Sequence, residues 1–179
     1  AKTQTLEGYY HIPEETNSLK SNSVLSLAED KTGQLWAGTW SGGLHRFDPT
    51  TKKIKRYYPS DSSSATKNLV GELPSIYVWS LHVDPKGTLW VGTQRGGLFR
   101  YDSATDTFEQ FKHDPERGDT LSWNFVRRII TAENGQLWIA TTRGLNVFDT
   151  EKKIFKRFMH DVNDKSSIGS NRIITVLEH

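Results

Sequence analysis

The chain has 179 residues, a length that suits about one domain, and its 23 Lys and Arg against 21 Asp and Glu leave a net charge of +2. Positive and negative charges this evenly balanced argue against a nucleic-acid-binding surface. The absence of cysteine excludes disulfide scaffolds, Cys-ligated zinc, iron–sulfur clusters and thiol nucleophiles. Hydrophobic residues are only 35% of the chain but aromatic residues reach 11%, which favours thin layers filled by large side chains over disorder.

An internal repeat organises the whole sequence. The pattern Gly-x-Leu-Trp-x-Gly/Ala-Thr occurs three times, with its tryptophans 54 and 48 residues apart at Trp36, Trp90 and Trp138. Each copy is followed by Gly-Leu-x-x-Phe/Tyr-Asp and then by a pair of large apolar residues. A period of this length indicates similar units that bury their apolar surfaces against one another.

Each unit contains four short segments with strand character, separated by turn sequences rich in Gly, Asp, Asn and Pro. No segment has sustained helical periodicity, which argues against a helical solenoid. We expect first strands at Val24–Ala28, Val78–Val83 and Val126–Thr131, second strands at the Leu-Trp segments, third strands at Leu44–Phe47, Leu98–Tyr101 and Leu145–Phe148, and fourth strands at Ile54–Tyr58, Phe108–Lys112 and Phe155–Met159.

Four antiparallel strands repeated at this period are typical of a β-propeller blade. The predicted fold is therefore all-β: a β-propeller fragment with three complete four-stranded blades plus one flanking strand at each end. Propellers usually have four to eight blades, so three do not close a ring. The predicted boundaries are 1–22 for the outer strand of a preceding blade and its linker, 23–69, 70–121 and 122–169 for the three blades, 170–176 for the inner strand of a following blade, and 177–179 for a tag remnant.

The ends of such an array would expose apolar faces and unpaired strand edges, which favour association. Two explanations stay open: the chain is a slice of a larger ring, or several copies close a ring together. The tag-like ending favours the slice.

The linkers between blades follow the same frame. From each of His11, His113 and His160 to the next Leu or Ile is eight residues. In the remaining linker Pro59 replaces the His, and Ser60–Glu72 forms a Ser-rich insertion that we interpret as an elongated surface loop.

These motifs resemble the two-component regulator propeller repeat. The resemblance rests on Gly-x-Leu-Trp-x-Gly-Thr-x-x-Gly-Gly-Leu-x-x-Phe/Tyr-Asp and on the linker His113-Asp114-Pro115 with Leu121-Ser122-x-Asn124-x-Val126, and it covers the chain up to residue 176. The third copy departs from the pattern, with Ala140 in place of the second Gly.

The resemblance implies part of the periplasmic sensor domain of a hybrid two-component histidine kinase from Bacteroides-like bacteria. Such a domain would respond to glycan fragments, would itself be non-catalytic and would need no cofactor or metal. The implied partners are a small-molecule or oligosaccharide ligand of the full ring and, as an open alternative, a homodimer or edge-to-edge contact. Neither nucleic acid nor membrane contact is implied for this segment.

Strand direction predicts where a ligand would bind. The turn between second and third strands and the linker before each first strand emerge on one face of the array. Aromatic, Arg and Asn side chains gather in these segments and break the repeat pattern, and they suit a sugar because ring faces cover C–H groups while the donors bind hydroxyls. The candidate ligand-binding residues are Trp40, Tyr77, Trp79, Arg95, Trp123, Asn124, Arg127, Arg128 and Arg143.

Residues shared by all copies have simpler interpretations. The tryptophans of the Leu-Trp segments are expected in the core, and the linker histidines are expected to hold the linkers rather than a metal. Asp48, Asp102 and Asp149 are expected to form the turns that end the third strands.

Two other functions stay open. A propeller lyase similar to the streptogramin-inactivating type would need His and Glu clustered around a metal on the mouth face. A protein-interaction scaffold also stays open, because a propeller fold does not by itself determine function. Because three blades supply only part of a ring, we expect the isolated chain to bind ligand weakly or not at all.

Overall fold

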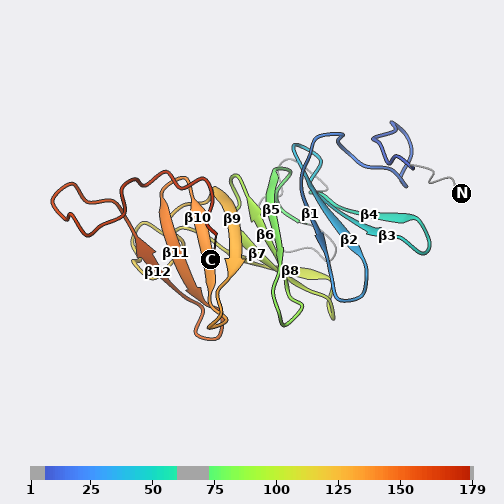
Figure 1. Ribbon diagram of the computed structural model, residues 1–179. Coiled ribbons are helices and arrows are strands. Elements are labelled where there is room, and N and C mark those ends of the chain that lie inside the picture. The colour runs from blue at the N-terminus through green and yellow to red at the C-terminus, as the bar shows by residue number, and fades with distance from the viewer. Residues whose placement is uncertain (1–6, 60–72, 178–179) are drawn as a thin grey trace, which may run out of the picture.

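The computed structural model describes residues 7–59 and 73–177, which form three four-stranded antiparallel sheets lying side by side (Figure 1). The predicted insertion Ser60–Glu72 lies outside the described residues, as do Glu178 and His179. The strands are β1 Val24–Glu29, β2 Leu35–Thr39, β3 Leu44–Asp48 and β4 Lys53–Tyr57 in blade 1; β5 Val78–Val83, β6 Leu89–Thr93, β7 Leu98–Asp102 and β8 Thr107–Phe111 in blade 2; and β9 Val126–Thr131, β10 Leu137–Thr141, β11 Gly144–Asp149 and β12 Ile154–Phe158 in blade 3.

Within each sheet, every strand pairs with the next one along the chain, which confirms the three predicted blades. The fourth strands begin and end one residue earlier than expected. Their first residues, Lys53, Thr107 and Ile154, pair with the aspartates that end the third strands, Asp48, Asp102 and Asp149. Each of these aspartates also accepts a hydrogen bond from a backbone N–H of the following turn, as predicted. Within the described ranges, no helix is long and apolar enough to cross a bilayer.

The hydrophobic core lies between the blades. Trp36 of blade 1 is 1% exposed and packs with Tyr57 of its own sheet and with Tyr101 of blade 2, at a ring distance of 4.9 Å. Trp90 is 2% exposed and repeats this contact with Phe148 of blade 3. Each sheet is therefore stabilised by its neighbour, and contacts between neighbouring sheets concentrate on the first strands β1, β5 and β9.

The second strands carry a small residue where the next blade comes close. A Cβ added to Gly92 would stand 2.6 Å from a methyl carbon of Val126 in β9, and one on Gly38 would meet Val78 of β5 at the same distance. Glycine at these positions lets the first strand of the next blade approach the sheet.

The two flanking segments occupy the places predicted for them. Tyr9 packs its ring 4.6 Å from Phe47, as Phe111 packs 4.9 Å from Phe148 between blades 2 and 3. At the other end the Asn171 carbonyl accepts the N–H of Gly144. In the described residues, neither segment has a strand ladder beyond these contacts and one bridge between His11 and Leu19.

The linkers are held by the histidines, as predicted. In the linkers that begin at His11 and His113, the ring Nδ1–H donates to the carbonyl of Leu19 or Leu121, and the backbone N–H donates to the side chain of an asparagine eleven residues on. His160 makes the same pair of bonds with Ile168 and Asn171.

A third-strand side chain completes two of the linkers. His45 Nε2 accepts the N–H of Lys20 at 2.9 Å, and Asn146 Oδ1 accepts the N–H of Ser122 at 2.8 Å. In blade 2 the corresponding linker residue is Pro74, which has no N–H, and the corresponding third-strand residue is Phe99. A polar side chain thus stands only where the backbone has a hydrogen to donate.

His45 should make stability depend on pH. Burial is the main cause that lowers its pKa from 6.5 to about 4, so folding excludes a proton that the unfolded chain binds. The folded state therefore loses up to about 3 kcal/mol as the pH falls from about 6.5 to about 4. We predict that His45→Asn, which copies the acceptor of blade 3, removes this part of the loss in urea unfolding at pH 7 and pH 4.5. Equal losses for the two proteins would contradict the assignment.

The between-blade core predicts unequal effects at equivalent tryptophans. Trp90→Ala should lower the free energy of unfolding by about 3–5 kcal/mol, because it empties a fully enclosed site. Trp138→Ala should cost about half as much, because Trp138 is only partly buried and packs on Phe158 alone among the described aromatic rings. Equal losses in urea unfolding would show that Trp138 is as enclosed as Trp90.

Candidate functional site

Each first strand contains a β-bulge at its second residue. In blade 1 the register shifts between Val24 and Ser26, so Leu25 has no partner on β2. Trp79 in β5 and Arg127 in β9 occupy the same place. A bulge re-aims one side chain relative to the regular ladder. The repeat therefore presents one special position per blade at the same end of the first strand, filled by a different residue type each time.

Four aromatic rings and one guanidinium form a continuous cluster at this end. Trp40, in the turn after β2, lies 5.2 Å from Tyr77 and 5.6 Å from Trp79. Trp79 lies 5.0 Å from Phe125, which precedes β9. The Arg127 guanidinium stands 5.0 Å from the Trp79 ring and 5.3 Å from the Phe125 ring. This aromatic cluster crosses both blade interfaces.

The cluster is open to solvent at one end and half-buried elsewhere. Trp40 is 39% exposed, whereas Tyr77, Trp79, Phe125 and Arg127 have intermediate exposure. All three ring contacts are edge-to-face, with interplanar angles of 61° to 79°, an arrangement favoured by the ring quadrupoles. The Nε of Arg127 is buried and has no hydrogen-bond partner among the described residues.

Trp123 and Arg143 form a second pair. The Arg143 guanidinium lies 3.8 Å from the centre of the Trp123 ring, whose other neighbour is the His113 ring at 5.4 Å. Both residues belong to the linker and turn segments of blade 3. The pair repeats the combination of an aromatic ring and a guanidinium found in the aromatic cluster.

The other three predicted residues are not brought into either group. Asn124 accepts the N–H of His113 at 2.8 Å, the same linker bond made by Asn22 and Asn171. Arg95 is exposed and makes no hydrogen bond or ion pair with the described residues. Arg128 is exposed and near His82, whose pKa is lowered by burial and further by the Arg128 charge.

Sequence reasoning missed Phe125. It holds the position directly before the first strand that Tyr77 holds in blade 2, and it joins Trp79 to Arg127. Aligning the residue before each first strand would have found it, because Ser23 and Arg172 are the other occupants of that position.

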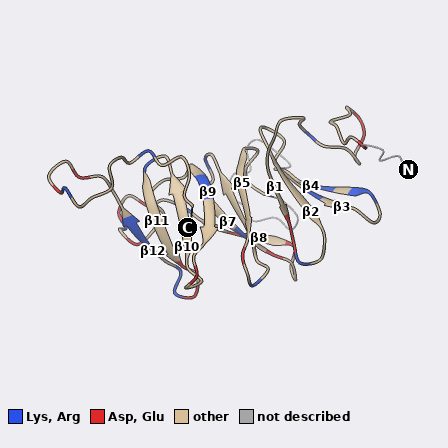
Figure 2. Ribbon diagram, in the orientation of Figure 1, with Lys and Arg blue, Asp and Glu red and all other residues tan. Residues whose placement is uncertain are grey.

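The cluster is exposed to solvent at Trp40. A hollow of about 590 Å³ lies elsewhere, over β3 and β4, and its lining includes Arg46, Lys55 and Arg56. Lys and Arg are spread over all three sheets among Asp and Glu (Figure 2). In residues 7–59 and 73–177, no three His, Asp or Glu side chains are grouped as a metal site would need.

Comparison with known proteins identifies the repeat. The family described as "Two component regulator propeller" matches residues 18–41 and 72–95, which include the first and second Leu-Trp segments. Two segments of the chain thus match the two-component regulator propeller repeat. The matched segments each run from a linker through a first and second strand, so they include Trp40, Tyr77, Trp79 and Arg95.

Proteins with similar repeats are signalling proteins. The chain is 34% identical to the Histidine kinase P4 of Formosa agariphila over 96% of its own length, but it spans only 12% of that protein. It is 28% identical to the extracellular domain of the hybrid two component system BT3049 of B. thetaiotaomicron, with a TM-score of 0.71 over 86% of this chain and 20% of that one. The extracellular domain of the hybrid two component system BT4673 from the same organism is 27% identical, with a TM-score of 0.66 over 89% of this chain and 19% of that one.

The regulator repeats also share their fold with an enzyme. Virginiamycin B lyase of Staphylococcus aureus matches with a TM-score of 0.56 over 84% of this chain and 44% of that one, at 15% identity. At this identity the likeness concerns the blade architecture alone.

The contact between Trp79 and Arg127 should be measurable as a coupling energy. We predict that a double-mutant cycle with Trp79→Leu and Arg127→Leu, both copying Leu25 of blade 1, gives about 0.5–1 kcal/mol in urea unfolding. A coupling energy of zero would mean that the guanidinium does not rest on the ring in solution.

Proposed function

We propose that this chain is part of the ligand-sensing propeller of a hybrid two-component sensor histidine kinase. The proposal is supported by the regulator repeats and by their similarity to extracellular domains of such systems. By the same similarity, the chain belongs to the periplasmic, extracytoplasmic part of an inner-membrane protein. The kinase chemistry belongs to other parts of that longer protein, and this segment is non-catalytic.

The aromatic cluster is the proposed contact for ligand, and glycan fragments are the proposed ligand class. Sugars offer apolar C–H groups on one side of the ring and hydroxyls around it. Flat indole and phenol rings beside a guanidinium match both kinds of group. Trp123 with Arg143 offers the same chemistry at the next blade.

The position of the cluster suggests how binding would become a signal. The rings come from three blades, and their contacts cross both interfaces between sheets. A ligand resting on them would favour one relative placement of neighbouring blades over others. Binding energy that differs between two placements is what shifts a conformational equilibrium.

Saturation-transfer NMR with cellotetraose, xylotetraose, mannotetraose and tetragalacturonate tests the proposal. We expect at least one sugar to bind with a Kd on the order of 1 mM, because three blades supply only part of a ring mouth. Trp79→Ala should abolish the transfer, because it removes the ring at the centre of the cluster.

The control is Tyr10→Ala, which removes a 64% exposed aromatic side chain outside the cluster and should leave the transfer unchanged. No transfer from any of the four sugars, or equal loss in both variants, would contradict glycan binding at the aromatic cluster. A stable protein partner isolated without any sugar would favour the scaffold alternative.

A further inference from the structure

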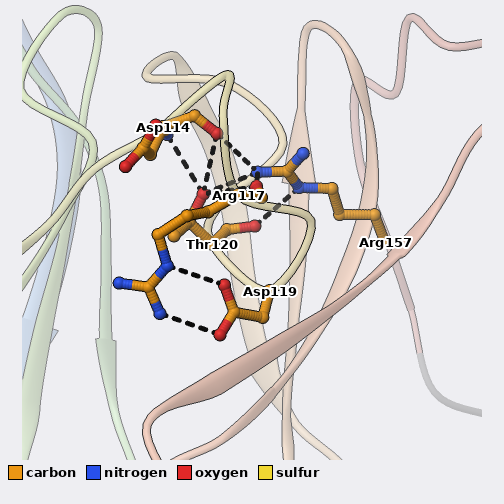
Figure 3. Close-up of polar contacts among 5 residues, drawn as sticks. All are labelled: Asp114, Arg117, Asp119, Thr120 and Arg157. Carbon is orange, nitrogen blue, oxygen red and sulfur yellow. Dashed lines mark hydrogen bonds and ion pairs between the residues drawn. The ribbon is translucent and has the colours of Figure 1, made fainter.

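Two of the linkers form the same small cradle for an arginine. Arg157 of β12 donates from Nε to the carbonyl of Thr120 at 2.7 Å and from Nη2 to the carbonyl of Arg117 at 2.7 Å and the Thr120 hydroxyl at 2.6 Å (Figure 3). The guanidinium thus crosses from the fourth strand of blade 3 to the linker that precedes the same blade.

Arg56 makes the equivalent contacts in blade 1. It donates to the carbonyls of Ser18 and Glu15 and to the Ser18 hydroxyl. The three acceptors occupy the same places in the linker as those of Arg157, counted from His11 and His113. A planar guanidinium with several fixed donors suits such a set of acceptors, and a shorter side chain does not reach it.

Blade 2 lacks both the arginine and the linker. Its fourth strand has Gln110 at this position, and the Gln110 amide donates to the carbonyl of Gly96 in its own sheet. The linker before blade 2 has Pro59 in place of the histidine and contains the insertion. Arginine is therefore present where the regular linker is present and absent where it is not.

The linker His160–Asn171 is regular but holds no arginine in the described chain. Its internal bonds repeat those of the other two, including the N–H of Asp161 to the Ser167 hydroxyl at 3.0 Å. Counted from His160, its three cradle acceptors are the carbonyls of Asp164 and Ser167 and the Ser167 hydroxyl. Most of its residues are exposed.

An apolar hollow in blade 3 matches this empty cradle. It measures about 250 Å³ and is lined by residues that include Ile130, Trp138 and Val176. Trp36 and Trp90 are 1% and 2% exposed because the next blade covers them, whereas Trp138 has only partial cover. A blade packed after blade 3 would supply both an arginine for the linker His160–Asn171 and a cover for Trp138.

We propose that the cradle at His160–Asn171 and the Trp138 hollow together bind a further blade of the same repeat, whose fourth strand carries an arginine before its last aromatic residue. A second copy of this chain does not fit, because Arg56 and Arg157 already occupy linkers of their own chain and blade 2 offers Gln110. The Histidine kinase P4 of Formosa agariphila, of which this chain spans 12%, has ample length for such a blade.

The test uses an extended protein that carries a fourth blade copied from the chain itself. In this protein, residues 1–172 are followed by a second copy of residues 126–177, so that the extra first strand takes the place of the segment after Arg172. Hydrogen exchange of the 160–171 amides should slow by about tenfold or more relative to the natural chain. The control carries Arg157→Gln in the appended copy only and should lose most of this protection. Equal protection in the two extended proteins would overturn the assignment of the cradle.

A second measurement does not depend on folding of the appended blade. In the natural chain the 113–124 amides should exchange more slowly than the 160–171 amides, because Arg157 occupies only the first of these linkers. Arg157→Gln, which copies blade 2, should raise the 113–124 rates by about tenfold, to those of 160–171. Unchanged 113–124 rates would show that the arginine does not hold the linker, and the proposal would fail whatever the extended protein does.

Discussion

The burial of Trp36 by blade 2 and of Trp90 by blade 3 is the contact on which the structure depends. A four-stranded sheet of this size cannot enclose an indole ring by itself, and Trp36 and Trp90 are enclosed because Tyr101 and Phe148 come from neighbouring sheets. Their indole N–H groups donate to Asp30 and Asp84, which pairs both buried indole donors. Blade 3 has Ala132 in place of this aspartate, and its Trp138 is the one of the three that is partly exposed.

This contact also places the candidate site. Packing sheet against sheet brings the first strands together, so that side chains at their bulges meet side chains from adjacent blades. The aromatic cluster therefore exists only because the blades are packed, and a change in blade spacing would alter it directly. The proposed sensing role would use this dependence, because a ligand that contacts several blades favours one relative placement of them.

The blades could be predicted from the sequence because each side-chain pattern occurs three times, so that an irregular residue in one copy does not obscure the strand assignment. The role of the linker histidines was predicted for the same reason. The arginine cradle could not be predicted: Arg56 and Arg157 appear in the fourth strands as ordinary exposed charges, and only the fold brings them to carbonyls 36 to 43 residues earlier in the chain. Within the site, the repeat-breaking residues Trp40, Trp79 and Arg127 do come together, whereas Asn124, equally conspicuous in sequence, makes a linker bond. The missed ring, Phe125, shows that a position before a strand is as informative as the strand itself.

The most direct test of the stacked-blade account is the solvent accessibility of the three repeat tryptophans. Fluorine NMR of the 5-fluorotryptophan-labelled chain, with resonances assigned by single Trp→Phe variants, reports line broadening by a soluble nitroxide. The account predicts little broadening for Trp36 and Trp90, which are 1% and 2% exposed, and clear broadening for Trp138. Equal protection of all three rings, or broadening of Trp36 and Trp90, would contradict burial of each ring by the blade that follows it.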